Sequence, residues 1–355
     1  MSKQHNLFQN SFSDIVTLDN FKRAYGRTQK TDTKYKRESI RFGFDLIENL
    51  KSLIERVKER TYTPEPYNVF TVYEPKERII AEPGFQDKIV QFAVHNILNP
   101  DFENKFIYDS YACINDKGTH QCAKRIQHFL AKSSWQWENP WIIKADIKEF
   151  FYSVKHDVLK SILQKEIASQ RVLSLLSKII DHSHREVGLP LGNVTSQLFA
   201  NIYLNELDKY CKRELSLKYY VRYMDDMVFI LPNREKARSV KGAISDFVQT
   251  ELDLELNQDK SKIFPMAQGV NMVGYKIWKT HKLLRNKTKQ TIKQKSSKFS
   301  SMLETGKITK QKVEQILNSW KGHADYASSE NFYQYLEDRF NFVERVNSKF
   351  IVSLE

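Results

Sequence analysis

The chain has 355 residues, of which 41% are hydrophobic and 28% charged, enough for one sizeable core or for two to three subdomains. Lysine and arginine number 56 against 43 aspartates and glutamates, and this net charge of +13 favours a polyanionic partner such as nucleic acid. No apolar run reaches the ~18–20 residues of a transmembrane helix, and neither a signal peptide nor a disulfide or zinc framework is evident, so we expect a cytoplasmic protein without a membrane partner.

The first part of the chain is expected to be basic and mainly helical. Apolar side chains recur at helical spacing between residues 40 and 57 and predict one amphipathic helix. From Tyr67 to Ile80 the pattern changes to two strands around a turn, which predicts a β-hairpin with Lys76 and Arg78 at its tip. Further helices are expected over 86–98 and 121–130.

The middle of the chain contains an isolated carboxylate and a glycine-rich loop. An apolar strand over 141–146 ends on Asp146, and the aromatic pair Phe150-Phe151 follows within five residues. After a helical stretch over 156–181, the run Gly188-Leu189-Pro190-Leu191-Gly192 breaks the periodicity. Its glycines and proline would let the backbone approach a ligand closely, and a capped helix is expected to follow it.

The central feature is the pair Asp225-Asp226, which lies between two β-prone arms from Val221 to Ile230. Adjacent carboxylates repel each other, and a divalent cation bound at the turn would relieve that repulsion. An Asp-Asp turn alone is more often a solvated loop. Asp146 would supply a third carboxylate if the two strands are neighbours in one sheet, because two-metal phosphoryl transfer needs carboxylates from separate segments around ions roughly 3.5–4 Å apart.

These motifs resemble, in their order along the chain, the palm of reverse transcriptases, and most closely those of diversity-generating retroelements. The residues that carry the resemblance are Asp146 with Phe150-Phe151, Gly188 to Gly192, Ser196-Gln197 and Tyr223-Met224-Asp225-Asp226. It extends over about residues 67–340. In one place the chain departs from the family, because Ile114 follows Ala112-Cys113 where an arginine is usual; Lys117 could replace it.

The resemblance implies an α+β fold of the right-hand polymerase type. Residues 1–140 would form the N-terminal helices and fingers, 141–275 a palm with an antiparallel sheet, and 276–355 a basic helical thumb; part of 156–187 could belong to the fingers. From Lys276 to Lys298 every charged side chain is cationic, which predicts a thumb helix that follows the phosphate backbone of the nucleic acid.

The resemblance also implies a role for individual residues. Two Mg2+ ions, or Mn2+ in their place, would be bound by Asp146, Ile147, Asp225 and Asp226. Lys260 would act as general acid near the leaving pyrophosphate. The dNTP would contact Lys76, Arg78, Phe151, Leu191 and Gln197, with Phe151 as a steric gate against the ribose 2′-hydroxyl unless it is a core residue. Template and primer would contact Gly192, Gly274, Tyr275, Lys289, Lys293 and Lys295.

The implied activity is RNA-directed DNA synthesis on template RNA and its RNA/DNA hybrid, and three biological roles stay open. The first is a diversity-generating retroelement enzyme, which miscopies adenines and works with a small basic accessory protein; the aliphatic Leu191, where many reverse transcriptases carry glutamine, favours it unless Leu191 merely packs. The second is an antiphage-defence enzyme with a noncoding RNA template, and a second reverse transcriptase is an alternative partner. The third, an inactive RNA-binding scaffold, is disfavoured by the intact aspartates. A mobile-intron protein is less expected because no maturase or endonuclease segment follows the thumb.

Overall fold

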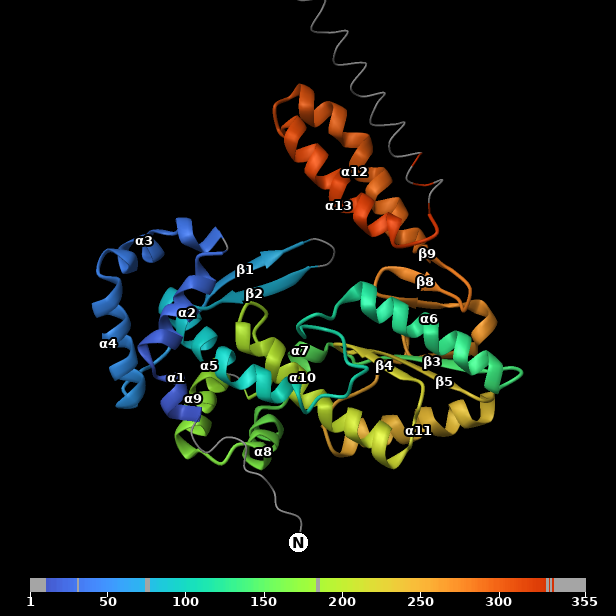
Figure 1. Cartoon of the computed structure of the whole chain (residues 1–355), viewed down its shortest axis with the longest axis horizontal. Helices are drawn as coiled ribbons and strands as arrows, with labels where there is room; N and C mark the ends of the chain where they lie inside the picture. Colours follow the sequence, from blue (N-terminus) through green and yellow to red (C-terminus); the bar gives the residue numbers. More distant parts are fainter. Residues whose placement is uncertain are drawn as a thin grey trace, which may run out of the picture. The chain divides into compact units, whose positions relative to one another are not determined.

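The computed structural model describes residues 11–30, 32–73, 77–182 and 186–329, together with Phe332 and Gln334 (Figure 1). It is an α+β protein with antiparallel strand pairs, as the sequence predicts. The chain forms two compact units. The first comprises Met1–Ile114, Ala145–Lys218 and Val240–Ser261, and the second comprises Asn115–Lys144, Tyr219–Ser239 and Lys262–Glu355. The division into fingers, palm and thumb stays a prediction.

Helices α1 to α5 open the first unit. Their bounds are α1 (Ser11–Ile15), α2 (Leu18–Thr28), α3 (Arg37–Phe44), α4 (Leu46–Lys58) and α5 (Phe85–Glu103), with a short 3-10 turn at Asp32–Tyr35. α2 begins at the Thr17 cap, whose hydroxyl accepts a hydrogen bond from the Asn20 amide, and it packs along α5. The Asn20 side chain in turn donates to the Ala93 carbonyl of α5, which joins the two helices through a buried polar contact.

The prediction of a single helix between residues 40 and 57 is wrong, because the structure has two helices there. The chain breaks at Asp45, where the backbone leaves the helical region, so that α3 and α4 are separate helices. Phe44, at the end of α3, is 79% exposed, whereas Leu50, Leu53, Ile54 and Val57 of α4 are buried. The apolar spacing continues across the break, and spacing alone therefore could not locate it.

The first unit also contains a two-stranded hairpin and four further helices, and the hairpin confirms the one predicted at 67–80. β1 (Asn68–Val72) pairs antiparallel with β2 (Arg78–Glu82), with Thr71 opposite Ile79. Lys76, at its predicted tip, lies outside the described residues. The helices are α7 (Phe150–Ser153), α8 (His156–Glu166), α9 (Gln170–Asp181) and α10 (Val194–Lys209), the last followed by a π-turn at Tyr210–Glu214.

The second unit contains the central sheet, in the strand order β4-β5-β3-β6. Its strands are β3 (Trp141–Asp146), which enters the first unit at Ala145, β4 (Tyr220–Tyr223), β5 (Asp226–Leu231) and β6 (Lys262–Pro265). Helix α6 (Thr119–Gln136) packs on β4 and β5, and α11 (Arg234–Thr250) follows β5. β5 and β3 are therefore neighbours in one sheet, the condition that the sequence left open.

The remainder of the second unit is a three-stranded meander followed by two helices. The strands are β7 (Val270–Met272), β8 (Tyr275–Ile277) and β9 (Lys282–Leu284), preceded by a short 3-10 turn at Met266–Gln268; the helices are α12 (Asn286–Glu304) and α13 (Lys310–Asp325). Lys276 and Lys282 thus lie in strands, and the cationic helix begins ten residues later than Lys276. Along the described part of the chain, no helix combines the length and the apolar character needed to cross a membrane.

Candidate active site

The Asp225-Asp226 pair lies at the tip of the β4–β5 hairpin. Tyr223 is opposite Asp226 in the strand register, so Met224 and Asp225 form a two-residue turn. Met224 has φ of +56°, in a region where a residue with a Cβ is strained and where such turns favour glycine. Arg222, which is 0% exposed, donates a hydrogen bond of 3.1 Å to the Met224 carbonyl. The guanidinium therefore helps to hold the turn from which the carboxylates project.

Asp226 is paired with a lysine of the neighbouring strand. The Lys144 Nζ atom of β3 lies 2.7 Å from Asp226 Oδ1, and both side chains are partly buried. Two adjacent carboxylates would destabilise the turn by mutual repulsion, and the ammonium offsets that repulsion. No sequence pattern singles out Lys144, because the pair joins residues 82 positions apart.

Asp146, at the end of β3, is 5% exposed and is held on several sides within the first unit. Lys260 Nζ lies 2.6 Å from its Oδ1 atom. The Asp146 carbonyl accepts from the Asn257 amide at 2.8 Å, and the Asn257 side chain accepts from the backbone amides of Asp259 and Lys260. The segment from Asn257 to Lys260 is thus held against Asp146 through both backbone and side-chain contacts.

The metal-binding capacity of these residues can be judged from their donor chemistry. Among the described residues, no three histidine, cysteine, aspartate or glutamate side chains form a group that could hold a metal ion. One oxygen each of Asp146 and Asp226 is already paired with a cation, because a lysine ammonium lies within hydrogen-bonding distance of it. Carboxylate oxygens are the hard donors that Mg2+ and Mn2+ prefer, so the side chains fit such ions. Ile147 is buried and could contribute only its backbone carbonyl.

The aromatic pair after Asp146 divides into a core residue and a more accessible one. Phe150 is 2% exposed, and its ring packs edge-on against Tyr203 at a centroid distance of 6.5 Å. Phe151 is only partly buried and lies 5.6 Å from Phe150, ring centroid to centroid. Phe150 is therefore the core residue of the pair. Phe151 is accessible enough to contact a nucleotide, as a steric gate must be.

The glycine-rich loop lies against β2. The Leu191 carbonyl accepts a 2.9 Å hydrogen bond from the Ala81 amide. Gly192 has φ of +136°, and a Cβ at this position would lie 2.5 Å from the Ala81 carbonyl oxygen, so only glycine allows this approach. Leu191 lines an apolar cavity of about 210 Å³ together with side chains from β1 and β2. Gln197 is exposed on α10, as is Arg78 on β2.

The sequence matches a known protein family over most of the residues described above. Residues 73–277 match the family described as reverse transcriptase (RNA-dependent DNA polymerase). The chain belongs to the reverse transcriptase family. The matched range contains β3, the β4–β5 hairpin, the glycine-rich loop and Lys260.

Two bacterial relatives are similar to this reverse transcriptase in sequence. YkfC of Escherichia coli is 27% identical over 276 residues, which cover 65% of this chain and 72% of YkfC. The group II intron-encoded protein LtrA of Lactococcus lactis is 23% identical over 303 residues, which cover 65% of this chain and 50% of LtrA. The chain therefore spans about half the length of LtrA.

Solved telomerase structures match about two thirds of the chain, at TM-scores below 0.5. A telomerase from Candida albicans has a TM-score of 0.49 at 13% identity, and the match covers 69% of this chain and 52% of the telomerase chain. A telomerase from Candida tropicalis has a TM-score of 0.47 at 14% identity, and the match covers 66% of this chain and 59% of the telomerase chain.

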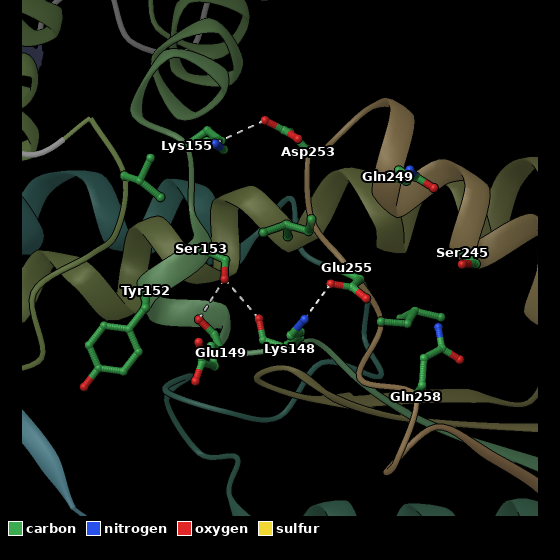
Figure 2. A pocket seen from close by; sticks show the side chains of 13 residues that line it. Lys148, Glu149, Tyr152, Ser153, Lys155, Ser245, Gln249, Asp253, Glu255 and Gln258 are labelled. Carbon is green, nitrogen blue, oxygen red and sulfur yellow. Dashed lines mark hydrogen bonds and ion pairs between the residues drawn. The ribbon is translucent and has the colours of Figure 1, made fainter.

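A polar cleft of about 590 Å³ is lined in part by residues that follow Asp146 in the sequence, beginning with Lys148 (Figure 2). Most of its lining comes from the segments 148–155 and 253–258, with further residues from α11 and Val187. Ion pairs join the two segments, between Lys148 and Glu255 at 2.9 Å and between Lys155 and Asp253 at 3.5 Å. Figure 2 shows Lys148 pointing toward Glu255 and Lys155 pointing toward Asp253. Lys148 and Lys155 are thus each paired with a carboxylate of the cleft.

The residues predicted to contact template and primer differ in their surroundings. Gly274 has φ of +90° in the turn between β7 and β8. Tyr275 is 0% exposed, with its ring close to those of His120 and Tyr326, and burial raises its pKa. The lysines of α12 differ too: the Nζ atoms of Lys289 and Lys293 lie 5.6 and 5.7 Å from the Phe332 ring centroid, and Lys295 is exposed. A template or primer contact by any of them stays a prediction.

Proposed function

We propose that this reverse transcriptase copies a dedicated RNA template into DNA by two-metal nucleotidyl transfer. The observation that carries the proposal is the β4–β5 hairpin, which presents Asp225 and Asp226 at its turn and is the sheet neighbour of the strand ending on Asp146. The turn also combines a strained residue, a buried arginine and a cationic partner on the adjacent strand, and backbone strain clusters at active sites.

Each step of the proposed chemistry is assigned to particular residues of this chain. Asp146, Asp225 and Asp226, with the Ile147 carbonyl, would hold two Mg2+ ions. The ions, when bound, activate the primer 3′-hydroxyl and neutralise the charge on the transferred phosphoryl group. Lys260 carries a proton beside Asp146 and could donate it to the leaving pyrophosphate.

The nucleotide itself would be selected by segments of the first unit. Lys76 and Arg78 would contact the triphosphate through charge-assisted hydrogen bonds. The ring of Phe151 would exclude a ribose 2′-hydroxyl, which makes deoxynucleotides the expected substrate. Gln197 and Leu191 would lie beside the nucleotide, and Gly192, Gly274, Tyr275 and the lysines of α12 beside template and primer.

For the biological role we propose a diversity-generating retroelement, with a small basic accessory protein as partner. The support is Leu191, an aliphatic side chain that lines an apolar cavity and offers no hydrogen bond to a nascent base pair. The alternative is an antiphage-defence enzyme that copies a noncoding RNA. The two differ in fidelity, since only the first requires frequent errors opposite template adenine.

A primer-extension assay tests the polymerase proposal. Purified protein is mixed with an RNA template, an annealed DNA primer, dNTPs and Mg2+, and the products are resolved by length. We expect primer extension to the template end, and none after chelation of Mg2+. Tight RNA binding without any extension in Mg2+ or Mn2+ would contradict the proposal and favour the RNA-binding scaffold.

A further inference from the structure

The first turn of α8 is joined to the glycine-rich loop by a buried histidine. His156 is 3% exposed, and its Nε2 atom lies 2.8 Å from the Gly188 carbonyl oxygen. A carbonyl can only accept a hydrogen bond, so Nε2 carries the proton. The other ring nitrogen, Nδ1, lies 3.5 Å from Asp181 Oδ1, and Asp181 is itself bound by Lys160 at 2.6 Å. Nδ1 is buried and makes no hydrogen bond to any residue that the structure describes, so the polar contact that fixes the ring is the one from Nε2 to the loop.

The same end of the loop is packed on the segment that carries Phe151. The Gly188 amide donates to the Val154 carbonyl at 2.7 Å, and the Leu189 amide donates to the Phe151 carbonyl at 2.6 Å. Gly188 has φ of +99°, and a Cβ there would lie 3.4 Å from the carbonyl oxygens of Phe151 and Tyr152. Of the hydrogen bonds that anchor Gly188, the one from His156 is made by a side chain.

The other end of the loop is fixed to different elements. The Leu191 carbonyl accepts from Ala81 of β2, and the Pro190 carbonyl accepts from the Ser196 hydroxyl of α10 at 2.8 Å. The five residues from Gly188 to Gly192 therefore connect the backbone of Phe151 to β2. A shift of Gly188 would move the Leu189 amide, which is bonded directly to Phe151.

We propose that His156 is a positioning residue for nucleotide selection, because it fixes the Gly188 carbonyl and thereby the register between the loop and Phe151. The inference rests on the proposed polymerase function and deepens it. His156 touches no substrate and acts through Gly188 and Leu189. A histidine that only filled the core would affect stability, whereas a positioning histidine also affects the choice between dNTP and rNTP.

Three variants separate these two roles. His156→Leu removes the donor at similar volume, and His156→Gln keeps an N–H donor that reaches about as far. Ile162→Val, on the same helix, is the matched control, because it weakens the core at a different buried site of α8. The measurement is the ratio of kcat/KM for a dNTP to that for the matching rNTP on one primed RNA.

We expect His156→Leu to lower this ratio about three- to tenfold, the effect of removing one positioning hydrogen bond. His156→Gln and Ile162→Val should stay near the wild-type ratio. An unchanged ratio in a folded, active His156→Leu protein would overturn the proposal. If the wild type synthesises no DNA, the polymerase function fails instead, and hydrogen–deuterium exchange still tests the contact.

Hydrogen–deuterium exchange provides that independent test. The amides of Gly188 and Leu189 are bonded to Val154 and Phe151, so their exchange reports how firmly the loop is anchored. We expect faster exchange at these amides in His156→Leu, and wild-type exchange in His156→Gln and Ile162→Val. Equal protection in His156→Leu and wild type would show that the histidine does not position the loop.

Discussion

The ammonium of Lys144 lies 2.7 Å from Oδ1 of Asp226, so that the first carboxylate of β5 is paired with the neighbouring strand β3. Asp226 directly follows Asp225 at the hairpin turn, and the pair carries two negative charges next to each other. Lys144 neutralises one of these charges from within the fold. A divalent cation that binds Asp226 must therefore compete with this lysine.

Replacing Lys144 by methionine should increase the stabilisation that Mg2+ provides. The variant keeps an apolar stem of similar length but leaves Asp226 without its ammonium, which costs about 1 kcal/mol or less in the absence of metal. Added Mg2+ then meets no competing cation, and the rise in unfolding temperature with Mg2+ should exceed that of the wild type. The control is Lys148→Met, whose partner Glu255 is not among the proposed ligands. The same Mg2+ response in Lys144→Met and wild type would show that no ion reaches Asp226.

Phe151→Val should increase the incorporation of ribonucleotides. The smaller side chain no longer meets the 2′-hydroxyl, whereas the buried Phe150 packs on Tyr203 and has no such role. Phe150→Leu is therefore the control, and it should lower the free energy of unfolding by about 1–3 kcal/mol without changing selection. Steady-state kinetics with dNTP and rNTP on one primed RNA measure the effect. Equal dNTP-over-rNTP selection by Phe151→Val and wild type would make Phe151 a packing residue.

The strands and hairpins that carry the site could be predicted from the sequence, because each depends on the residue pattern within its own segment. Alternating apolar residues and turn chemistry predicted the strand ending on Asp146 and the hairpins at 67–80 and 221–230, and all three are present. The order of motifs also predicted the reverse transcriptase family, which the match over residues 73–277 confirms.

The contacts that organise the site have no local signal. Lys144 and Asp226 are 82 positions apart, and His156 and Gly188 are 32 apart. Neither lysine nor histidine spacing indicates such a partner, because the pairing depends on which strands and loops become neighbours. Arg222 has the same property: its charge suggests a surface residue, yet the fold buries it beneath the turn at Met224.

Leu191→Gln should make copying more accurate. A glutamine could hydrogen-bond beside the nascent base pair, and one such bond is worth about 0.5–1.5 kcal/mol, or severalfold to about tenfold in discrimination. Sequencing of cDNA made on one RNA gives the error spectrum, and Leu191→Met, which keeps an apolar side chain, is the control. If the wild type copies adenine as accurately as the other bases, the retroelement role is wrong and the defence role is favoured.

Neutralising Lys289, Lys293 and Lys295 together should weaken template–primer binding and reduce its salt dependence. The slope of log affinity against log salt concentration is negative, and each phosphate that a lysine no longer neutralises reduces its magnitude by about 0.7–0.9. The matched control neutralises Lys51 and Lys58 of α4, which pair with Glu48 and Glu55. Binding is measured by fluorescence anisotropy over a salt series. A triple variant with the wild-type slope would place these lysines in solvent.

The two-metal assignment is tested most directly by single-turnover incorporation of one dNTP on a primed RNA, compared between wild type, Asp146→Asn and Asp225→Asn. Asp253→Asn is the control, because this carboxylate pairs with Lys155 in the polar cleft and is not a proposed ligand. We expect both site variants to bind the primed RNA normally and to lose incorporation, because an amide oxygen carries no charge to hold the ions. Asp253→Asn should incorporate at the wild-type rate. Wild-type incorporation by either Asp146→Asn or Asp225→Asn would contradict the two-metal assignment.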